Sequence, residues 1–205
     1  HPGYGFLAEN EILGEVCGYH NISLIGPRPN VIEALGDKLL AKEGARKAGV
    51  QTVPGTGEIK TEKEALTQAS KLGYPIMIKA VACGGGRGID SVKSEKALIP
   101  SYREIRTLAK QLFGNEIVFF EKAIDDYKHI EVQILGYGKR NVLHFYERDC
   151  SIQRRNQKLI EFSPADISES LRNKLIDSAI NVAKYFNYTN AGTVEFLVTN
   201  EDVYF

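Results

Sequence analysis

Hydrophobic and polar residues alternate most regularly in the second half of the chain. In residues 129–135 (HIEVQIL), aliphatic residues alternate with His, Glu and Gln. Because successive side chains of a strand point to opposite faces, this pattern predicts a strand with one buried face and one polar face. Residues 192–199 predict another strand, in which Glu195 and Leu197 share the face opposite Val194, Phe196 and Val198. The turn-forming residues after the first strand, followed by an apolar run at 141–147, predict a hairpin.

The other segments mix helices with short strands. Apolar residues at helical spacing predict helices at residues 8–19, 29–35, 37–48, 61–72, 95–112 and 168–186. Short apolar runs bounded by turn residues predict strands at residues 21–25, 76–81, 89–92 and 117–124. Asp37 is expected to cap the third helix and Gly49 to end it. The mixture predicts an α/β or α+β chain.

A glycine-rich segment follows the predicted strand at 76–81. Lys79 lies within this otherwise apolar strand, and residues 84–88 read GGGRG. Glycine lets backbone N–H groups approach an anion closely, and a lysine in an apolar strand is unfavourable unless an anion meets it. A phosphate-binding loop therefore fits the segment, although a flexible hairpin loop with a solvated arginine fits the glycines equally well.

The glycine-rich segment lacks the two commonest nucleotide-binding signatures. No Ser or Thr follows a Gly-Lys pair, as a P-loop requires. The residues after the glycines, 89–92, predict a returning strand and not the helix of a dinucleotide-binding fold. A strand lysine, a glycine-rich turn and a second strand are typical of a lid over phosphates, as in ATP-grasp enzymes and, more distantly, protein kinases.

The composition disfavours several classes of protein. The 205 residues carry 26 basic and 26 acidic side chains, so the net charge is zero and no basic field favours nucleic acid. The three cysteines lack C-x-x-C spacing, which fits a reducing compartment and argues against zinc. No apolar run reaches membrane-spanning length. The chain begins at His1 and ends within a predicted strand at Phe205, so we expect a fragment truncated at both ends.

Seven motifs follow one another along the chain: HPGYGFLAEN (1–10), GDK (36–38), IMIKA (76–80) with GGGRG (84–88), FEK (120–122), KHIEVQILG (128–136), ERDCSIQRRNQK (147–158) and AGTVEF (191–196). Together they resemble the biotin carboxylase component of biotin-dependent carboxylases, an ATP-grasp enzyme, over essentially the whole chain. The QRRNQK form is more similar to the acyl-CoA and pyruvate carboxylases than to the free-standing bacterial subunit.

The resemblance implies an ATP-grasp fold with the tail end of an N-terminal Rossmann-like domain. Residues 1–35 would end that N-terminal domain, and residues 36–205 would form the ATP-grasp domain. Within the second domain, the resemblance implies a mobile lid at 50–122 and a central sheet at 123–205, incomplete at its C-terminus.

The resemblance also implies site residues. It assigns ATP contacts to Lys38, Lys79, Gly84, Gly85, Gly86, Gly88, Glu121, Lys122, Ile124, His129, Gln153 and Leu197. Glu195 matches a carboxylate ligand of the Mg²⁺ or Mn²⁺ ion that bridges the phosphates, and Lys158 matches a catalytic lysine beside the bicarbonate site. From the residues alone, Lys38 equally fits a surface lysine, the polar face of 129–133 a solvated strand, and Glu195 a salt bridge.

The reaction implied by the resemblance is the ATP-dependent carboxylation of biotin, which proceeds from bicarbonate through carboxyphosphate. The implied partners are ATP, bicarbonate, a biotin carrier domain and a carboxyltransferase domain or subunit, in an oligomeric parent of the cytoplasm or mitochondrial matrix. Neither nucleic acid nor membrane is implied. Another ATP-grasp ligase, such as carbamoyl phosphate synthetase, and a non-catalytic ATP-binding module are the alternatives.

The sequence departs from the family's pattern in two places. Ala82 and Cys83 stand where the family usually has further small residues, often glycine. The family's second pair of metal ligands and its bicarbonate-binding residues would follow Phe205. We therefore expect the fragment alone to be inactive.

Overall fold

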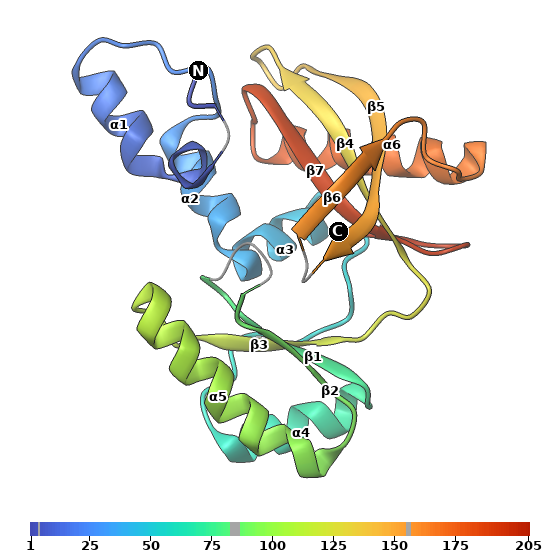
Figure 1. Cartoon of the computed structure of the whole chain (residues 1–205). Coiled ribbons are helices and arrows are strands. Elements are labelled where there is room, and N and C mark those ends of the chain that lie inside the picture. The colour runs from blue at the N-terminus through green and yellow to red at the C-terminus, as the bar shows by residue number, and fades with distance from the viewer. Residues whose placement is uncertain (4, 83–86, 155–156) are drawn as a thin grey trace. The chain divides into compact units, whose positions relative to one another are not determined.

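Two β-sheets, each with its own helices and hydrophobic core, organise the chain (Figure 1). The computed structural model describes residues 1–3, 5–82, 87–154 and 157–205. Unit 1 consists of His1–Thr52, Tyr127–Ile152 and Lys158–Phe205. Unit 2 consists of Val53–Asp126 and Gln153–Gln157. The mixture of helices and strands confirms the predicted fold class.

The sheet of unit 1 has the strand order β6-β5-β4-β7-β8. Its strands span Lys128–Gly136 (β4), Val142–Arg154 (β5), Gln157–Phe162 (β6), Asn190–Val198 (β7) and Val203–Tyr204 (β8). The central strand β4 pairs antiparallel with both β5 and β7. The predicted alternation in β4 and β7 is confirmed, because the aliphatic and aromatic residues of one face are buried in a single core: Ile130, Val132, Ile134, Val194, Phe196 and Val198.

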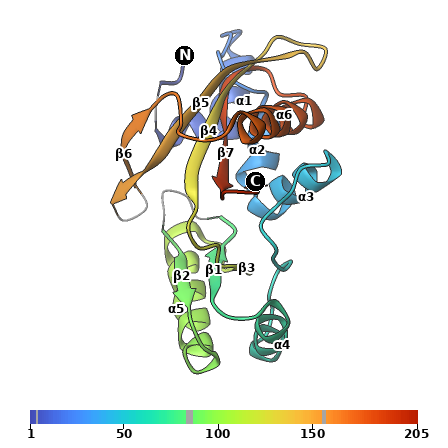
Figure 2. The same cartoon turned by 90° about the vertical axis from the view of Figure 1, so that its right-hand side faces the viewer.

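Helix α6 (Glu169–Tyr185) packs on this apolar face (Figure 2). The helix begins where Ser168 accepts a hydrogen bond from the backbone N–H of Leu171, as an N-cap residue does. Leu175 and Ala179 of α6 are fully buried in the same core as β4 and β7. The opposite, polar face of the sheet is not covered by α6, so the candidate site residues of β4 and β7 are sought there.

Unit 1 begins with η1 (Phe6–Glu9), α1 (Glu11–Tyr19), α2 (Pro29–Gly36) and α3 (Lys38–Lys47). Asp37 caps α3 as predicted, because its Oδ1 accepts the N–H groups of Leu39 at 2.8 Å and Leu40 at 3.0 Å. Gly49 follows the end of α3 with a φ of 76°, a left-handed conformation that glycine adopts at little cost.

The strand predicted at residues 21–25 is wrong, since this segment is irregular between α1 and α2. A short apolar run becomes a strand only where a neighbouring strand pairs with its backbone, and among the described residues no strand does so here. Strand β6 lay outside the predicted strands, because its sequence QKLIEF lies in a polar stretch with little alternation.

Unit 2 contains a three-stranded sheet in the order β2-β1-β3, with two helices packed against it. These elements are α4 (Glu62–Leu72), β1 (Ile76–Ala80), β2 (Ile89–Val92), α5 (Glu95–Phe113) and β3 (Val118–Lys122). The predicted returning strand is confirmed, because β2 pairs antiparallel with β1 and places Ile89 opposite Lys79. Within the described part of the chain, no helix combines the length and the apolar character that crossing a membrane would require.

Candidate functional site

Lys79 has a carboxylate partner within unit 2. It lies on the central strand β1, and its Nζ is 2.5 Å from Oε2 of Glu121 on the neighbouring strand β3. The Glu121 side chain is only 7% exposed, whereas the Lys79 side chain is 24% exposed. A buried carboxylate is strongly unfavourable without a cation, so Lys79 stabilises Glu121 while part of its own side chain remains accessible to an anion.

The Lys122 side chain holds the backbone that leads into β1. Its Nζ donates to the carbonyl oxygens of Gly73 at 2.8 Å and Tyr74 at 3.0 Å, and its backbone N–H donates to Pro54. The side chain thus links the end of β3 to the segment that precedes β1. The assignment of Lys122 to ATP binding stays a prediction.

A backbone hydrogen bond joins the end of β1 to the residue before β2, because the N–H of Ala80 donates to the carbonyl oxygen of Gly88 at 2.9 Å. Gly88 is buried and has a φ of 65°, a conformation that favours glycine. Gly84, Gly85 and Gly86 lie outside the described residues, as does Cys83. The phosphate-binding role of this segment stays a prediction.

The polar face of the unit 1 sheet carries two carboxylates in direct opposition. Glu131 of β4 and Glu195 of β7 are Cα partners in the antiparallel register. Like charges placed opposite each other on neighbouring strands are destabilising. Here the ammonium of Lys158, on β6, forms an ion pair with both carboxylates, with Nζ at 2.5 Å from Oε1 of Glu195. Lys158 therefore neutralises a repulsion that the strand register creates.

The two carboxylates differ in their exposure. The side chain of Glu131 is 4% exposed, whereas that of Glu195 is 52% exposed. The contacts with His129, whose Nε2 is 3.6 Å from Oε2 of Glu195, and with Lys158 lower the pKa of Glu195 to about 2. Glu195 is thus an ionised and accessible carboxylate, while Glu131 is enclosed by protein.

Arg148 of β5 holds Glu131 from the other side. Its Nη2 contacts Oε1 of Glu131, its Nη1 donates to Oε1 of Gln133 at 3.1 Å, and its Nε is 3.3 Å from Oε2 of Glu161. Gln133 donates in turn to the carbonyl oxygen of Gly192 on β7 at 2.8 Å. The polar side chains of β4 therefore belong to a network of ion pairs and hydrogen bonds. The alternative interpretation, a strand face exposed only to solvent, is wrong.

Glu195 fits one ligand of a magnesium ion that is shared with nucleotide phosphates. Mg²⁺ in such sites is bound through one or two carboxylates together with phosphate oxygens and water. The Glu195 carboxylate is ionised and half exposed, so it offers an oxygen of the required kind. The salt bridge considered from the sequence is also present, because Lys158 contacts the same carboxylate.

A second group of possible metal ligands does not fit a metal ion. One ligand atom each from Glu131, Cys150 and Glu161 lie within 4.8 Å of one another. However, Glu131 already binds Arg148 and Lys158. Burial and the charge of Glu131 raise the pKa of the Cys150 thiol to about 12, which opposes formation of the thiolate that a metal would require.

The remaining assigned residues are spread over several elements. Lys38 is the first residue of α3, Ile124 follows β3, and Gln153 lies near the end of β5; all three are half-buried. Leu197 stands opposite His129 in the register of β7 and β4, so these two lie beside the Glu195 cluster. The structure brings together His129, Lys158 and Glu195, and it separately joins Lys79 to Glu121.

The structural network also includes functional candidates that the sequence had not identified. Glu131 was recognised only as part of a polar strand face, and Arg148 only as part of a polar motif. The relevant signal is the register of three strands, which places Arg148 opposite Glu131 and Glu131 opposite Glu195.

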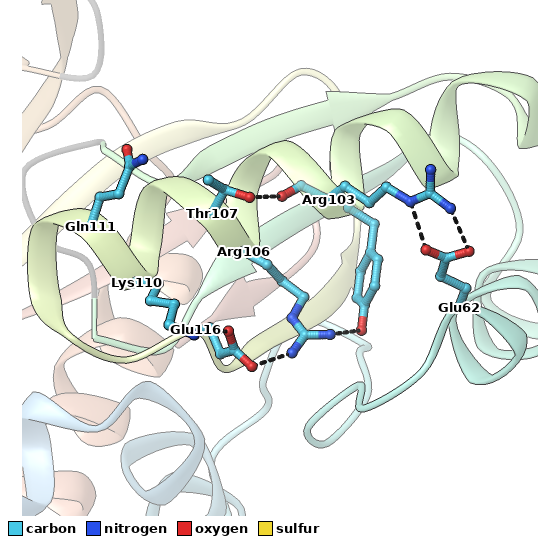
Figure 3. Close-up of a pocket in the computed structure, with 8 residues that line it drawn as sticks. Glu62, Arg103, Arg106, Thr107, Lys110, Gln111 and Glu116 are labelled. Carbon is cyan, nitrogen blue, oxygen red and sulfur yellow. Dashed lines mark hydrogen bonds and ion pairs between the residues drawn. The ribbon is translucent and has the colours of Figure 1, made fainter.

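A cavity of about 420 Å³ lies beside α5 in unit 2 (Figure 3). Its charged side chains are already paired: Arg103 binds Glu62 at 2.6 and 2.9 Å, and Arg106 contacts Glu116 at 2.5 Å and the Tyr102 hydroxyl at 3.0 Å. None of the residues implied by the resemblance lines this cavity. We assign it no part in nucleotide binding.

Comparison with known proteins identifies the family. Residues 37–205 match the family model described as "Carbamoyl-phosphate synthase L chain, ATP binding domain". The chain belongs to this ATP-binding domain family. Residues 1–32 match a second model, "Biotin carboxylase, N-terminal domain". The second match agrees with the resemblance to biotin carboxylases, which the relatives and solved structures described below confirm.

Curated relatives named as biotin carboxylases and pyruvate carboxylases match nearly the whole chain. It is 50% identical over 200 residues to the biotin carboxylase of Nostoc sp., covering 97% of this chain and 45% of that protein. It is 46% identical to the pyruvate carboxylase of Bacillus subtilis, covering 100% of this chain and 18% of that protein. The chain therefore spans less than half the length of these curated relatives.

Solved structures of the family confirm the ATP-grasp fold. The biotin carboxylase of Campylobacter jejuni matches with a TM-score of 0.96 and 45% identity, covering 99% of this chain and 46% of that one. The biotin carboxylase domain of the Hydrogenobacter thermophilus 2-oxoglutarate carboxylase matches with a TM-score of 0.94 and 45% identity, covering 100% and 46%. That second structure was solved with MgADP, ADP and bicarbonate.

Proposed function

We propose that the protein carries out, or forms part of an enzyme that carries out, the ATP-dependent carboxylation of biotin. The observation that carries the proposal is the Lys158 ammonium held between Glu131 and Glu195 on the polar face of the sheet. This cluster combines a cation suited to a small anion with an accessible carboxylate suited to a divalent metal. The homologous structure solved with MgADP and bicarbonate supports a magnesium ion and a bicarbonate ion as the two ligands.

The proposed reaction has two stages. A bicarbonate oxygen attacks the γ-phosphorus of ATP, the bond to the β-phosphate oxygen breaks, and carboxyphosphate and ADP form. Carboxyphosphate then releases CO₂ and phosphate, and the ureido nitrogen of biotin bonds to the carbon of CO₂ while its proton passes to the released phosphate. The first stage consists mainly of positioning and charge neutralisation, because the protein forms no covalent bond to the phosphoryl group.

The lysines of the chain supply the positive charge for this stage. Lys158 is the proposed catalytic residue and binds bicarbonate, while Lys38 and Lys79 bind the ATP phosphates. Gly84, Gly85, Gly86 and Gly88 are proposed to cover the phosphates. Charge-assisted hydrogen bonds of this type are about twice as strong as neutral ones, which makes lysines effective at anionic oxygens.

The remaining nucleotide contacts are proposed on residues that flank these groups. Glu121, Lys122 and Ile124 are proposed to meet the adenine, partly through backbone groups. His129 and Gln153 are proposed to contact the nucleotide, and Leu197 is proposed to form one face of the adenine pocket. Glu195 is the proposed ligand of Mg²⁺, with Mn²⁺ as a possible substitute. When bound, the metal ion would neutralise charge on the phosphate oxygens.

The proposed partners follow from the reaction. Biotin would arrive on a carrier domain, and a carboxyltransferase domain or subunit would use the carboxylated biotin. The assembly is proposed to be oligomeric and to lie in the cytoplasm or in the mitochondrial matrix. Relatives of the chain include biotin carboxylases described as chloroplastic.

The test is ADP release by the protein expressed from its complete gene, measured with ATP, Mg²⁺ and free biotin. We expect ADP release to depend on bicarbonate and to increase when biotin is added. Release that depends on ammonia and yields carbamoyl phosphate would favour a carbamoyl-phosphate synthase. ATP binding without any bicarbonate-dependent release would favour a non-catalytic module.

A further inference from the structure

We propose that Arg172 is a positioning residue for the edge strand β6, which carries Lys158. Arg172 lies near the start of α6, and its guanidinium donates to three partners. Nε donates to Oε1 of Glu147 on β5 at 2.9 Å, Nη1 to Oε2 of Glu169 at 2.6 Å, and Nη2 to the carbonyl oxygen of Ala165 at 3.0 Å. This inference rests on the proposed function, because only that function gives Lys158 a part in the reaction.

Strand β6 lies at the edge of the sheet and has β5 as its one neighbouring strand in the described part of the chain (Figure 2). None of its residues from Lys158 to Phe162 is buried, and its apolar side chains are all exposed. Because burial of apolar surface is the main favourable term in folding, such a strand gains little from the core. Ion pairs of Lys158 and Glu161 hold the middle of the strand. The end of the strand therefore depends on its pairing with β5 and on the segment that follows.

The segment after β6, residues 163–168, is attached to both β5 and α6. It leads to α6, which covers the apolar face of the sheet. Within it, Ala165 is 2% exposed and belongs to the core of unit 1. The N–H of Ala165 donates to Oε1 of Glu147 at 3.2 Å, and its carbonyl oxygen accepts from Arg172. Glu147, Arg172 and Ala165 therefore form a closed ring of three hydrogen bonds, which we call the β5–α6 clasp.

The clasp depends on the arginine. The side chain of Glu147 is 0% exposed and that of Arg172 is 16% exposed. Oε2 of Glu147 has no hydrogen-bond partner among the described residues, so the contacts of Oε1 are what compensate this buried carboxylate. A guanidinium holds several acceptors at once because its donors form a rigid planar fork, whereas the ammonium of a lysine is a point charge.

A second attachment of the same segment is more exposed. Nζ of Lys128 on β4 donates to the carbonyl oxygen of Asp166 at 2.6 Å, and it lies 3.7 Å from Oδ2 of Asp149. The Lys128 side chain is 38% exposed, so water competes for these contacts more than for those of Arg172. We therefore expect the clasp, more than Lys128, to hold the segment.

Loss of the clasp would release residues 163–168 and, with them, the end of β6. The ammonium of Lys158 lies in the same short strand, so it would sample a wider range of positions. The proposed phosphate ligands Lys38 and Lys79 belong to α3 and β1, which the clasp does not contact. The expected signature is therefore a change in the KM for bicarbonate without a change in the KM for ATP.

The experiment compares Arg172→Met, Arg172→Lys and the unsubstituted protein in bicarbonate-dependent ADP release, using protein expressed from its complete gene. For Arg172→Met we expect the KM for bicarbonate to rise by about fivefold or more, with the KM for ATP changed by less than about twofold. Arg172→Lys keeps the charge beside Glu147 but loses the fork, so we expect a rise of about twofold to threefold.

Hydrogen exchange observes the strand directly. In Arg172→Met we expect peptides that cover residues 158–168 to exchange about fivefold faster or more, because local opening of this segment becomes easier. Peptides that cover the central strands β4 and β7 should keep their exchange rates within about twofold. Equal acceleration in all peptides would show a general loss of stability and would overturn the positioning role.

Arg106→Met is the matched control. Arg106 is also a partly buried arginine of a helix, and its Nη2 contacts Glu116 at 2.5 Å while its Nη1 donates to the Tyr102 hydroxyl at 3.0 Å. These partners all belong to unit 2. We expect Arg106→Met to lower the Tm, and to leave the KM for bicarbonate and the exchange over 158–168 within about twofold of the original values.

The possible outcomes separate the two proposals. An unsubstituted protein without bicarbonate-dependent ADP release would overturn the proposed function and, with it, the part of the clasp in the reaction. With an active unsubstituted protein, an unchanged KM for bicarbonate in Arg172→Met would overturn the positioning role alone, whether or not exchange over 158–168 becomes faster. If Arg172→Met does not fold, Arg172→Lys takes its place. An unchanged KM and unchanged exchange in Arg172→Lys would then overturn the role.

Discussion

Glu131 and Glu195 stand directly opposite each other on β4 and β7, yet one is buried and the other is half exposed. Two carboxylates in this relationship repel each other unless a cation lies between them. Lys158 contacts both, so the same lysine that is proposed to bind bicarbonate also stabilises the folded sheet.

Lys158→Met should therefore reduce stability as well as activity. The substitution removes one cation from a buried carboxylate and leaves the two glutamates facing each other. Breaking a buried ion pair costs about 3 kcal/mol or more when the remaining charge is left uncompensated, so we expect a smaller loss here because Arg148 still contacts Glu131. The free energy of unfolding, measured by urea denaturation, checks the prediction.

Lys174→Met is the control for this measurement. Lys174 pairs with Asp202 at 3.3 Å in the same unit, but both side chains are well exposed. Exposed ion pairs contribute little, so we expect a much smaller loss of stability than in Lys158→Met. Equal losses in the two variants would contradict the bridging role of Lys158.

Lys79→Gln should weaken ATP binding by about tenfold or more, which corresponds to about 1.4 kcal/mol of lost charge-assisted bonding. Isothermal titration calorimetry with MgATP measures the dissociation constant. Lys93→Gln is the control, because Lys93 is an exposed lysine of the same unit between β2 and α5. An unchanged dissociation constant in Lys79→Gln would show that Lys79 stabilises Glu121 in the fold and does not bind ATP.

The pairing of Lys79 with Glu121 complicates that measurement, since the substitution also removes a cation that contacts a buried carboxylate. The double variant Lys79→Gln with Glu121→Gln removes both charges. We expect the double variant to recover part of the lost Tm but not the lost ATP affinity. Recovery of affinity together with Tm would mean that the single variant acts through instability.

The sequence predicted the buried strand faces correctly but did not predict which strands pair, and the difference has a physical reason. The two-residue alternation is a local property, so the buried faces of β4 and β7 could be predicted from the residues alone. The strand expected at 21–25 failed because strand formation depends on a partner elsewhere in the chain. The contacts of Glu131 could not be predicted for the same reason. They depend on how β4 pairs with β5 and β7, and the sequence of a single strand does not determine that register.

Cys150 should react slowly with alkylating reagents in the folded protein. Burial and the nearby Glu131 raise its pKa to about 12, so at about pH 8 only a minute fraction is the reactive thiolate. Mass spectrometry after treatment with iodoacetamide should find Cys17, which is half-buried, labelled well before Cys150. Rapid labelling of Cys150 without denaturant would contradict its enclosed position beside the network.

The same raised pKa predicts how stability changes in alkali. Because the folded pKa of Cys150 lies above its ordinary value of 9.0, the folded chain binds more protons than the unfolded chain between about pH 9 and 12. The contribution of Cys150 to stability is therefore present below about pH 9 and is lost as the pH rises toward 12. Cys150→Ala should show a shallower decline of the unfolding free energy over this range.

Unit 2 should respond to nucleotide in the glycine-rich segment at residues 82–88. We predict that residues 50–122 act as a lid over ATP, with hinges near residues 51–57 and 121–125, because most of them share a core of their own and they carry the glycine-rich segment. Hydrogen exchange measured with and without MgATP should show slower exchange in peptides that cover residues 82–88.

Ala65 and Ala69 of α4 are buried in the core of unit 2, so peptides that cover α4 serve as the internal control and should change little. In Lys79→Gln the added protection should disappear at the same MgATP concentration, since the lysine that precedes the turn is lost. Equal exchange over 82–88 with and without nucleotide in the unsubstituted chain, under conditions where calorimetry shows binding, would rule out the lid.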